Sequence, residues 1–79
     1  MNELMKNISK IHTTKMGILR ISNNLNIDSN KVVDYCKKVV LDCNSKIYKK
    51  GKNWYCENNN TKITINSSTY TIITAHYMI

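Results

Sequence analysis

The chain has 79 residues and a net charge of +7, from eleven lysines and one arginine against five acidic residues. A chain this short has room for one domain with one modest core, which excludes an enzyme built from a cofactor-binding domain plus a substrate domain. The positive charge favours a polyanionic partner, nucleic acid above an anionic membrane surface, although charge for solubility alone would give the same balance.

The first half of the chain predicts two to three helices. Residues 2–11 place three apolar side chains on one face of a short helix: Leu4, Ile8 and Ile11. Thr13 or Thr14 can cap a second helix over residues 14–24, because a threonine oxygen accepts from a free backbone N–H. Gly17 weakens that helix unless another group packs close to it. A third helix is predicted over residues 29–41, where valines and Cys36 form an apolar stripe.

After Asn44 the hydrophobic pattern changes to a period of two. Four β-rich segments follow, separated by the turn-like sequences GK, NNN and NSS: SKIYKK, NWYCE, TKITIN and TYTIITAH. Three short breaks between four strands indicate an antiparallel meander. The sequence therefore predicts one α+β domain over residues 1–79, with helices over about 2–41 packed on one face of a four-stranded antiparallel sheet over about 45–76.

The segment KIYKKGKNWY, residues 46–55, combines four lysines with three aromatic residues. Lysines neutralise phosphates and aromatic rings stack on unpaired bases, so the segment is a candidate nucleic-acid contact. Ordinary strand composition would look the same. Side chains alternate along a strand, so Trp54 and Tyr55 must face opposite ways. The candidate binding residues here are Lys46, Lys49, Lys50, Lys52, Trp54 and Tyr55.

The open face of the predicted sheet extends this surface. If Ile63 and Ile65 face the helices, then Lys62, Thr64 and Asn66 face away from them. If Ile73 and Ala75 also face the helices, the open face gains four more side chains: Tyr70, Ile72, Thr74 and His76. A register shifted by one residue would bury His76 instead.

The two histidines allow a catalytic hypothesis. RNA is cleaved without metal when a base takes the 2′-OH proton, an acid protonates the leaving 5′-oxygen, and a cation stabilises the charged phosphorane. Histidine suits the two proton transfers and lysine or arginine the third role. The catalytic candidates are His12, His76, Arg20 and Thr74, with Lys52 and Lys62 as further cations. Two histidines in a chain of this length also need no functional explanation.

The cysteines and the N-terminal residues predict a compartment. The N-terminal sequence MNELMKNISK is too polar for a signal peptide and no long apolar segment exists, so we expect a cytoplasmic protein without membrane contact. Thiols stay reduced there. Three widely spaced cysteines without a CxxC pair predict no disulfide, no metal site and no cofactor.

Three motifs carry a resemblance: HTTxxGxxRIxxNL at 12–25, GKNWY at 51–55 and ITINSxxYTIITAH at 63–76. In this order they resemble the small bacterial domain-of-unknown-function family 3781. This resemblance implies relatives but no established function. The layout of helices followed by a meander is also similar, more distantly, to the barnase–RelE group of toxin-like ribonucleases. That similarity implies metal-independent RNA cleavage by residues on the sheet face and the first helices, and it transfers no residue by motif.

The leading hypothesis is a small basic RNA-binding protein that acts as a metal-independent, toxin-like ribonuclease or binds RNA without cleaving it. In the catalytic form His76 acts as general acid or base with His12 as its partner. Arg20 and Lys52 hold the phosphate, and Thr64 or Thr74 positions it. The alternatives are a noncatalytic nucleic-acid-binding module and a protein-interaction factor, such as a mobile-element inhibitor of a nucleic-acid enzyme. Nucleic acid, RNA above DNA, is the expected partner, while an antitoxin or other protein partner and a homodimer stay open.

Overall fold

The computed structural model describes residues 2–78, with the helices in the first half of the chain and the strands in the second. Its helices are α1 (Glu3–Lys6), α2 (Lys15–Leu25) and α3 (Val32–Leu41), with short 3-10 helices at η1 (Ile8–Lys10) and η2 (Ser29–Lys31). The strands are β1 (Lys46–Lys50), β2 (Asn53–Asn58), β3 (Thr61–Asn66) and β4 (Ile72–Tyr77). They form one sheet in the order β1-β2-β3-β4, with every neighbouring pair antiparallel. The predicted α+β fold with a meander sheet is confirmed.

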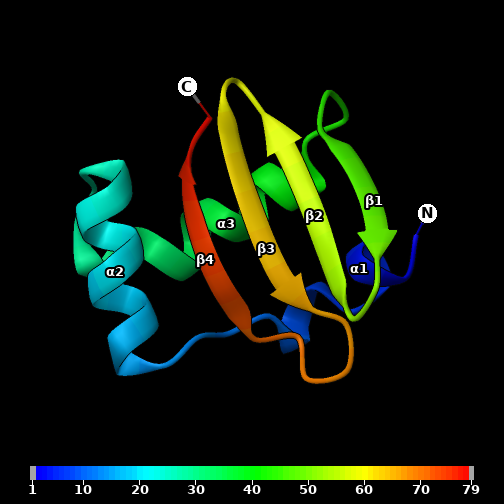
Figure 1. Cartoon of the computed structure of the whole chain (residues 1–79), viewed down its shortest axis with the longest axis horizontal. Helices are drawn as coiled ribbons and strands as arrows, with labels where there is room; N and C mark the ends of the chain where they lie inside the picture. Colours follow the sequence, from blue (N-terminus) through cyan, green and yellow to red (C-terminus); the bar gives the residue numbers. More distant parts are fainter. Residues whose placement is uncertain (1, 79) are drawn as a thin grey trace.

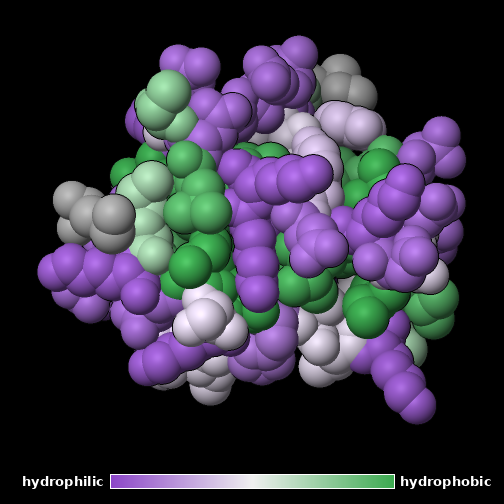
Figure 2. Space-filling model, turned by 180° about the vertical axis from the view of Figure 1, so that it is seen from behind, coloured by the Kyte–Doolittle hydropathy of each residue, from purple (hydrophilic) through white to green (hydrophobic). Residues whose placement is uncertain are grey.

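The helices leave one face of the sheet uncovered (Figure 1). Helices α1 and α3 lie behind the sheet, and α2 lies beside β4. Figure 2 views the molecule from the helix side, where hydrophobic side chains show between charged and polar ones. No helix within residues 2–78 is long and apolar enough to span a membrane.

The core lies between the sheet and the helices because the strands alternate apolar and polar side chains. Ile63 and Ile65 on β3 are fully buried, and Cys56 on β2 is paired directly with Ile63. The apolar stripes of the helices cover this face of the sheet. The buried hydrophobic residues are Leu4, Ile11, Ile21, Leu25, Val32, Cys36, Val39, Val40, Cys56, Ile63, Ile65, Ile72 and Ala75.

Strand β4 contains an irregularity that corrects the predicted assignment of its faces. Thr64 pairs with Thr74 but Ile65 pairs with Ile72, so β4 has one extra residue, Ile73, at this point. A bulge of this kind changes which face the following side chains occupy. Ile72 is therefore buried at 1% exposure and Ile73 is 39% exposed, the reverse of the expectation. Residues after the bulge, including Ala75 in the core, follow the expected alternation.

Tyr70 lies on the other side of the bulge and is not on the open face. Its backbone has a φ of +59°, in the left-handed region, and its ring packs against the core cluster. The Asn7 side-chain amide donates a hydrogen bond of 3.0 Å to the Tyr70 hydroxyl. Tyr70 therefore connects the N-terminal segment to the sheet, and its predicted place on the open face was wrong.

The HTT segment attaches the helices to the sheet. The backbone of His12 forms a parallel bridge with Thr71, in which His12 N donates to Tyr70 O and Ile72 N donates to His12 O. The Thr13 hydroxyl donates to Ile72 O at 2.9 Å. Thr14 is the N-cap of α2, because its hydroxyl accepts from Gly17 N at 3.0 Å. The capping prediction is confirmed.

Gly17 is buried beside Thr13, and a side chain there would overlap Thr13 Oγ1. Alanine favours a helix over glycine by about 1 kcal/mol, but a forced overlap in a packed region costs about 1–3 kcal/mol. We expect Gly17→Ala to lower the free energy of unfolding by about 1 kcal/mol or more, measured by urea denaturation. Asn23→Ala, at an exposed position of the same helix, is the control and should not destabilise the protein. A Gly17→Ala protein that is more stable than the wild type would contradict the close packing at Thr13.

The three cysteines are free thiols in different environments. Burial raises the pKa of the Cys36 thiol to about 12, with a smaller contribution from Cys56. Burial likewise raises the pKa of the Cys56 thiol. Cys43, after α3, is exposed.

The thiolate is the reactive form of cysteine, so buried thiols with a raised pKa should react slowly. We expect iodoacetamide to alkylate Cys43 rapidly in the native protein and to reach Cys36 and Cys56 only upon unfolding. Peptide mass spectrometry after timed alkylation measures this order, and urea-unfolded protein is the control. Equal native rates at all three sites would show that the core opens far more readily than its packing implies.

Candidate nucleic-acid interface

Two rows of polar side chains cross the uncovered face of the sheet. Strand alternation and the pairing register place Lys46, Glu57, Lys62 and His76 in one row, here the charged row. The neighbouring row, here the tyrosine row, is formed by Tyr48, Tyr55, Thr64 and Thr74. Neither row contains a Val, Ile, Leu or Met side chain.

The tyrosine row contains a pair of stacked aromatic rings. Tyr48 on β1 and Tyr55 on β2 are direct cross-strand neighbours, with ring centroids 5.4 Å apart and planes inclined by 20°. Lys46 Nζ lies 5.6 Å from the Tyr48 centroid, and Lys62 Nζ lies 5.0 Å from the Tyr55 centroid. Thr64, next to Tyr55, is 8% exposed. The open face therefore presents two rings in contact with two cations.

The charged row has a carboxylate between two lysines. Glu57 on β2 pairs with Lys46 on β1 and with Lys62 on β3. Neither lysine nitrogen lies within 4 Å of a Glu57 carboxylate oxygen. The salt bridges found in residues 2–78 join Lys6 to Glu3 and Lys31 to Asp28. The Tyr48 hydroxyl donates to Glu57 Oε2 at 2.5 Å instead. This hydrogen bond links the two rows.

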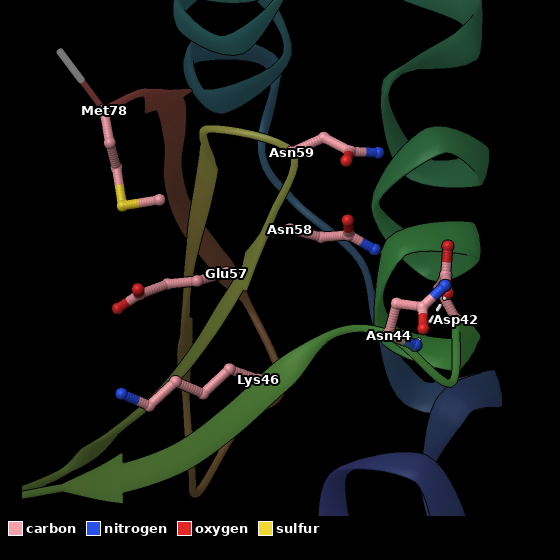
Figure 3. Close-up of a pocket in the computed structure, with 7 residues that line it drawn as sticks. All are labelled: Asp42, Asn44, Lys46, Glu57, Asn58, Asn59 and Met78. Carbon is pink, nitrogen blue, oxygen red and sulfur yellow. Dashed lines mark hydrogen bonds between the residues drawn. The ribbon is translucent and has the colours of Figure 1, made fainter.

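A cavity of about 440 Å³ lies at the β1 end of the charged row. Figure 3 shows Lys46 and Glu57 pointing to one side of the sheet, with Asn58, Asn59, Asp42 and Asn44 on the other side. The cavity thus continues from the open face around the edge where β1 begins and β2 ends. Its lining is Asp42, Asn44, Lys46, Glu57, Asn58, Asn59 and Met78. Within residues 2–78 no three His, Cys, Asp or Glu side chains are grouped so that they could hold a metal ion.

Only part of the predicted lysine–aromatic surface lies on this face. Trp54 packs against the core on the helix side, while Tyr55 faces the other way, as strand alternation requires. Lys49 pairs with Trp54 and shares its face. Lys50 pairs with Asn53 at the end of the open face, and Lys52 lies in the turn between β1 and β2.

The structure separates the two histidines. His12 bridges to Thr71 before β4 begins, and His76 lies near the end of β4. Thr71 and His76 are five residue steps apart along the extended chain, or about 16 Å at ~3.3 Å per residue. We expected His76 to lie within one side-chain reach of His12 or Arg20, and the His12 alternative was wrong. The exposed Arg20 on α2 forms no ion pair in the described part of the chain.

Each histidine ring forms its own local hydrogen bonds. His12 Nδ1 lies 2.8 Å from Lys10 O, and Nε2 lies 3.2 Å from Thr71 Oγ1. A carbonyl can only accept, so His12 Nδ1 carries the proton and the Thr71 hydroxyl donates to Nε2 when the ring is neutral. His12 therefore joins the HTT segment to β4. Its predicted catalytic role stays a prediction.

Tyr48 and Glu57 belong to this face, and neither was among the candidate residues drawn from the sequence. Tyr48 lies within the KIYKK motif, in the same alternation as Lys46. Its position follows from strand parity once β1 is assigned. Glu57 required the hairpin register, which places it opposite Lys46. The sequence thus contained the signal for Tyr48 and lacked a direct one for Glu57.

The hydrogen bond to Glu57 raises the pKa of the Tyr48 phenol, with smaller contributions from burial and from the Glu57 charge. The folded state thus disfavours ionised Tyr48. This contribution to stability is present below the ordinary pKa of tyrosine and is lost as the pH rises through the raised value. We expect Glu57→Gln to lower the pKa of Tyr48 toward its ordinary value, followed by NMR of the assigned ring during a pH titration. Glu3→Gln removes the same charge on α1 and should leave that titration unchanged.

The comparisons with known proteins add a family and no activity. Neither a curated protein nor a solved structure matches the chain significantly. One family model matches residues 5–76, nearly the whole chain, and its description is "Protein of unknown function (DUF3781)". The chain therefore belongs to the DUF3781 family.

Proposed function

We propose that this protein binds single-stranded nucleic acid, with RNA favoured, across the open face of its sheet. The observation that carries the proposal is the stacked pair Tyr48 and Tyr55, with Lys46 and Lys62 beside the rings. Aromatic rings on an uncovered sheet stack on unpaired bases, and adjacent cations neutralise the phosphates between those bases. The net charge of +7 supports the same class of partner.

A stacked base would stabilise the tyrosine rings more than their present contacts with lysine do. An exposed cation–π contact contributes about 0.5–1 kcal/mol. A base stacked on an aromatic side chain contributes about 1–3 kcal/mol. A phosphate can draw a flexible lysine off the ring while a base takes its place, so both groups gain a stronger partner. Duplex nucleic acid does not offer free base faces, which is why a single strand is the favoured form.

The separation of the histidines removes the support for a His12–His76 catalytic pair. Binding does not depend on that pair, because Tyr48, Tyr55, Lys46 and Lys62 all lie on the one face. We therefore place RNA binding ahead of ribonuclease activity by those two residues. The predicted nucleic-acid-binding residues that lie in these two rows are Lys46, Tyr55, Lys62 and Thr64.

The test is fluorescence anisotropy with a labelled single-stranded RNA of mixed sequence, over a range of salt concentrations. We expect affinity to fall steeply with salt and Lys46→Gln/Lys62→Gln to reduce the slope of log K against log salt by about 1.4, the counterion release of two single-strand phosphate contacts. Tyr55→Ala should weaken binding by about 5- to 150-fold, the equivalent of about 1–3 kcal/mol of stacking.

The matched control removes the same charge from the helix side. Lys31 and Lys38 line a pocket there with Ile27 and Tyr35, away from the open face. Lys31→Gln/Lys38→Gln should leave the salt slope close to that of the wild type. Equal slopes for both double variants would show that total charge alone attracts RNA. Absence of RNA binding at low salt would end the proposal and leave a protein partner as the better candidate.

A further inference from the structure

We infer that the charged row is a cleavage site for RNA, in which Glu57 is the general base, Lys62 the cation that stabilises the phosphorane, and His76 the general acid. The inference rests on the proposed RNA binding and assigns a reaction to the same face. It replaces His12 with Glu57 as the partner of His76. The supporting observations are the register of the three strands and the hydrogen bonds of Glu57 and His76.

The register places the three groups in the order that the reaction needs. Lys62 is the direct cross-strand partner of both Glu57 and His76. Strands lie about 4.8 Å apart, so the backbones of Glu57 and His76 are separated by about 10 Å with Lys62 between them. All three side chains project from the same face. A phosphodiester above Lys62 would have the carboxylate on one side and the imidazole on the other.

The hydrogen bonds of His76 leave one ring nitrogen available. His76 Nδ1 lies 3.1 Å from the backbone carbonyl of Tyr77, which can only accept, so Nδ1 carries the proton in this hydrogen bond. Nε2 has no hydrogen-bond partner among residues 2–78. When the imidazole is protonated, Nε2–H can therefore donate to an incoming group. An imidazole with a free ring nitrogen is the side chain most often used as a general acid.

Glu57 is held in place and keeps one oxygen available. The Tyr48 hydroxyl donates to Oε2, which fixes the carboxylate without using Oε1. No salt bridge in the described residues occupies it. The cavity of about 440 Å³ lies on the Lys46 side of Glu57, so it leaves that side of the carboxylate open. A carboxylate that is oriented by a tyrosine and open to solvent can accept a proton.

The reaction balances without a metal or another co-reactant. Glu57 takes the proton of the ribose 2′-OH, and the 2′-oxygen forms a bond to phosphorus. Lys62 faces the negative charge that develops on the non-bridging oxygens. The bond from phosphorus to the 5′-oxygen breaks, and His76 Nε2 gives its proton to that oxygen. The products are a 2′,3′-cyclic phosphate and a free 5′-hydroxyl.

The experiment uses the whole protein with EDTA and a labelled RNA, together with the same sequence carrying 2′-O-methyl groups. The methylated RNA keeps its bases and phosphates but lacks the nucleophile, so it reports binding alone. We expect cleavage of the unmodified RNA, with a 2′,3′-cyclic phosphate identified by mass spectrometry. Rates should follow a bell-shaped pH profile, since one group must be deprotonated and the other protonated.

The variants distinguish cleavage by Glu57 and His76 from cleavage by His12 and His76. Glu57→Gln and His76→Gln should each lower the cleavage rate by about 10²-fold or more while binding of the methylated RNA persists. His12→Gln should change the rate by no more than about 2-fold, because His12 lies off the row. Thermal unfolding of each variant shows that the loss is not one of folding.

The binding and cleavage assays together distinguish three outcomes. If the protein binds methylated RNA but gives no cyclic phosphate at any pH, the inference is overturned and the proposed RNA binding stands. If Glu57→Gln and His76→Gln cleave as fast as the wild type, the cleavage does not come from this row and the inference is also overturned. If neither RNA binds, both this inference and the proposed function fail.

Discussion

The alternation of side chains along β2 and β3 is the constraint on which the rest of the structure depends. Cys56, Ile63 and Ile65 face the helices, and Tyr55, Glu57, Lys62 and Thr64 face the other way. In two neighbouring strands this separates a dry face from a wet one. The apolar stripes of the helices cover the dry face, so both hydrophobic surfaces are removed from water.

The same constraint concentrates functional groups. A meander sheet pairs consecutive strands, so residues from three short segments become direct neighbours on the open face. Lys46, Glu57 and Lys62 are separated in sequence but adjacent in the charged row. The Tyr48–Glu57 hydrogen bond then orients the carboxylate and fixes the stacked tyrosines beside it. Binding and the inferred cleavage use this one surface.

The N-terminal segment stabilises the fold and is not part of that surface. His12 and Thr13 attach to the start of β4, and Thr14 begins α2. The contact between Gly17 and Thr13 explains why a helix-weakening residue sits inside α2. The HTT motif, which contains the catalytic candidate His12, forms hydrogen bonds that hold the helices against the sheet.

The sequence by itself determined the elements, their order, the meander and most of the core, because these follow from local periodicity and turn residues. It also determined that Trp54 and Tyr55 face opposite ways. The tertiary structure alone decided which side chains meet. The bulge at Ile73 reversed the expected faces of Ile72 and Ile73, since one extra residue shifts the alternation. The separation of His12 from His76 and the pairing of Glu57 with Lys62 depended on register, which residue spacing along the chain does not specify.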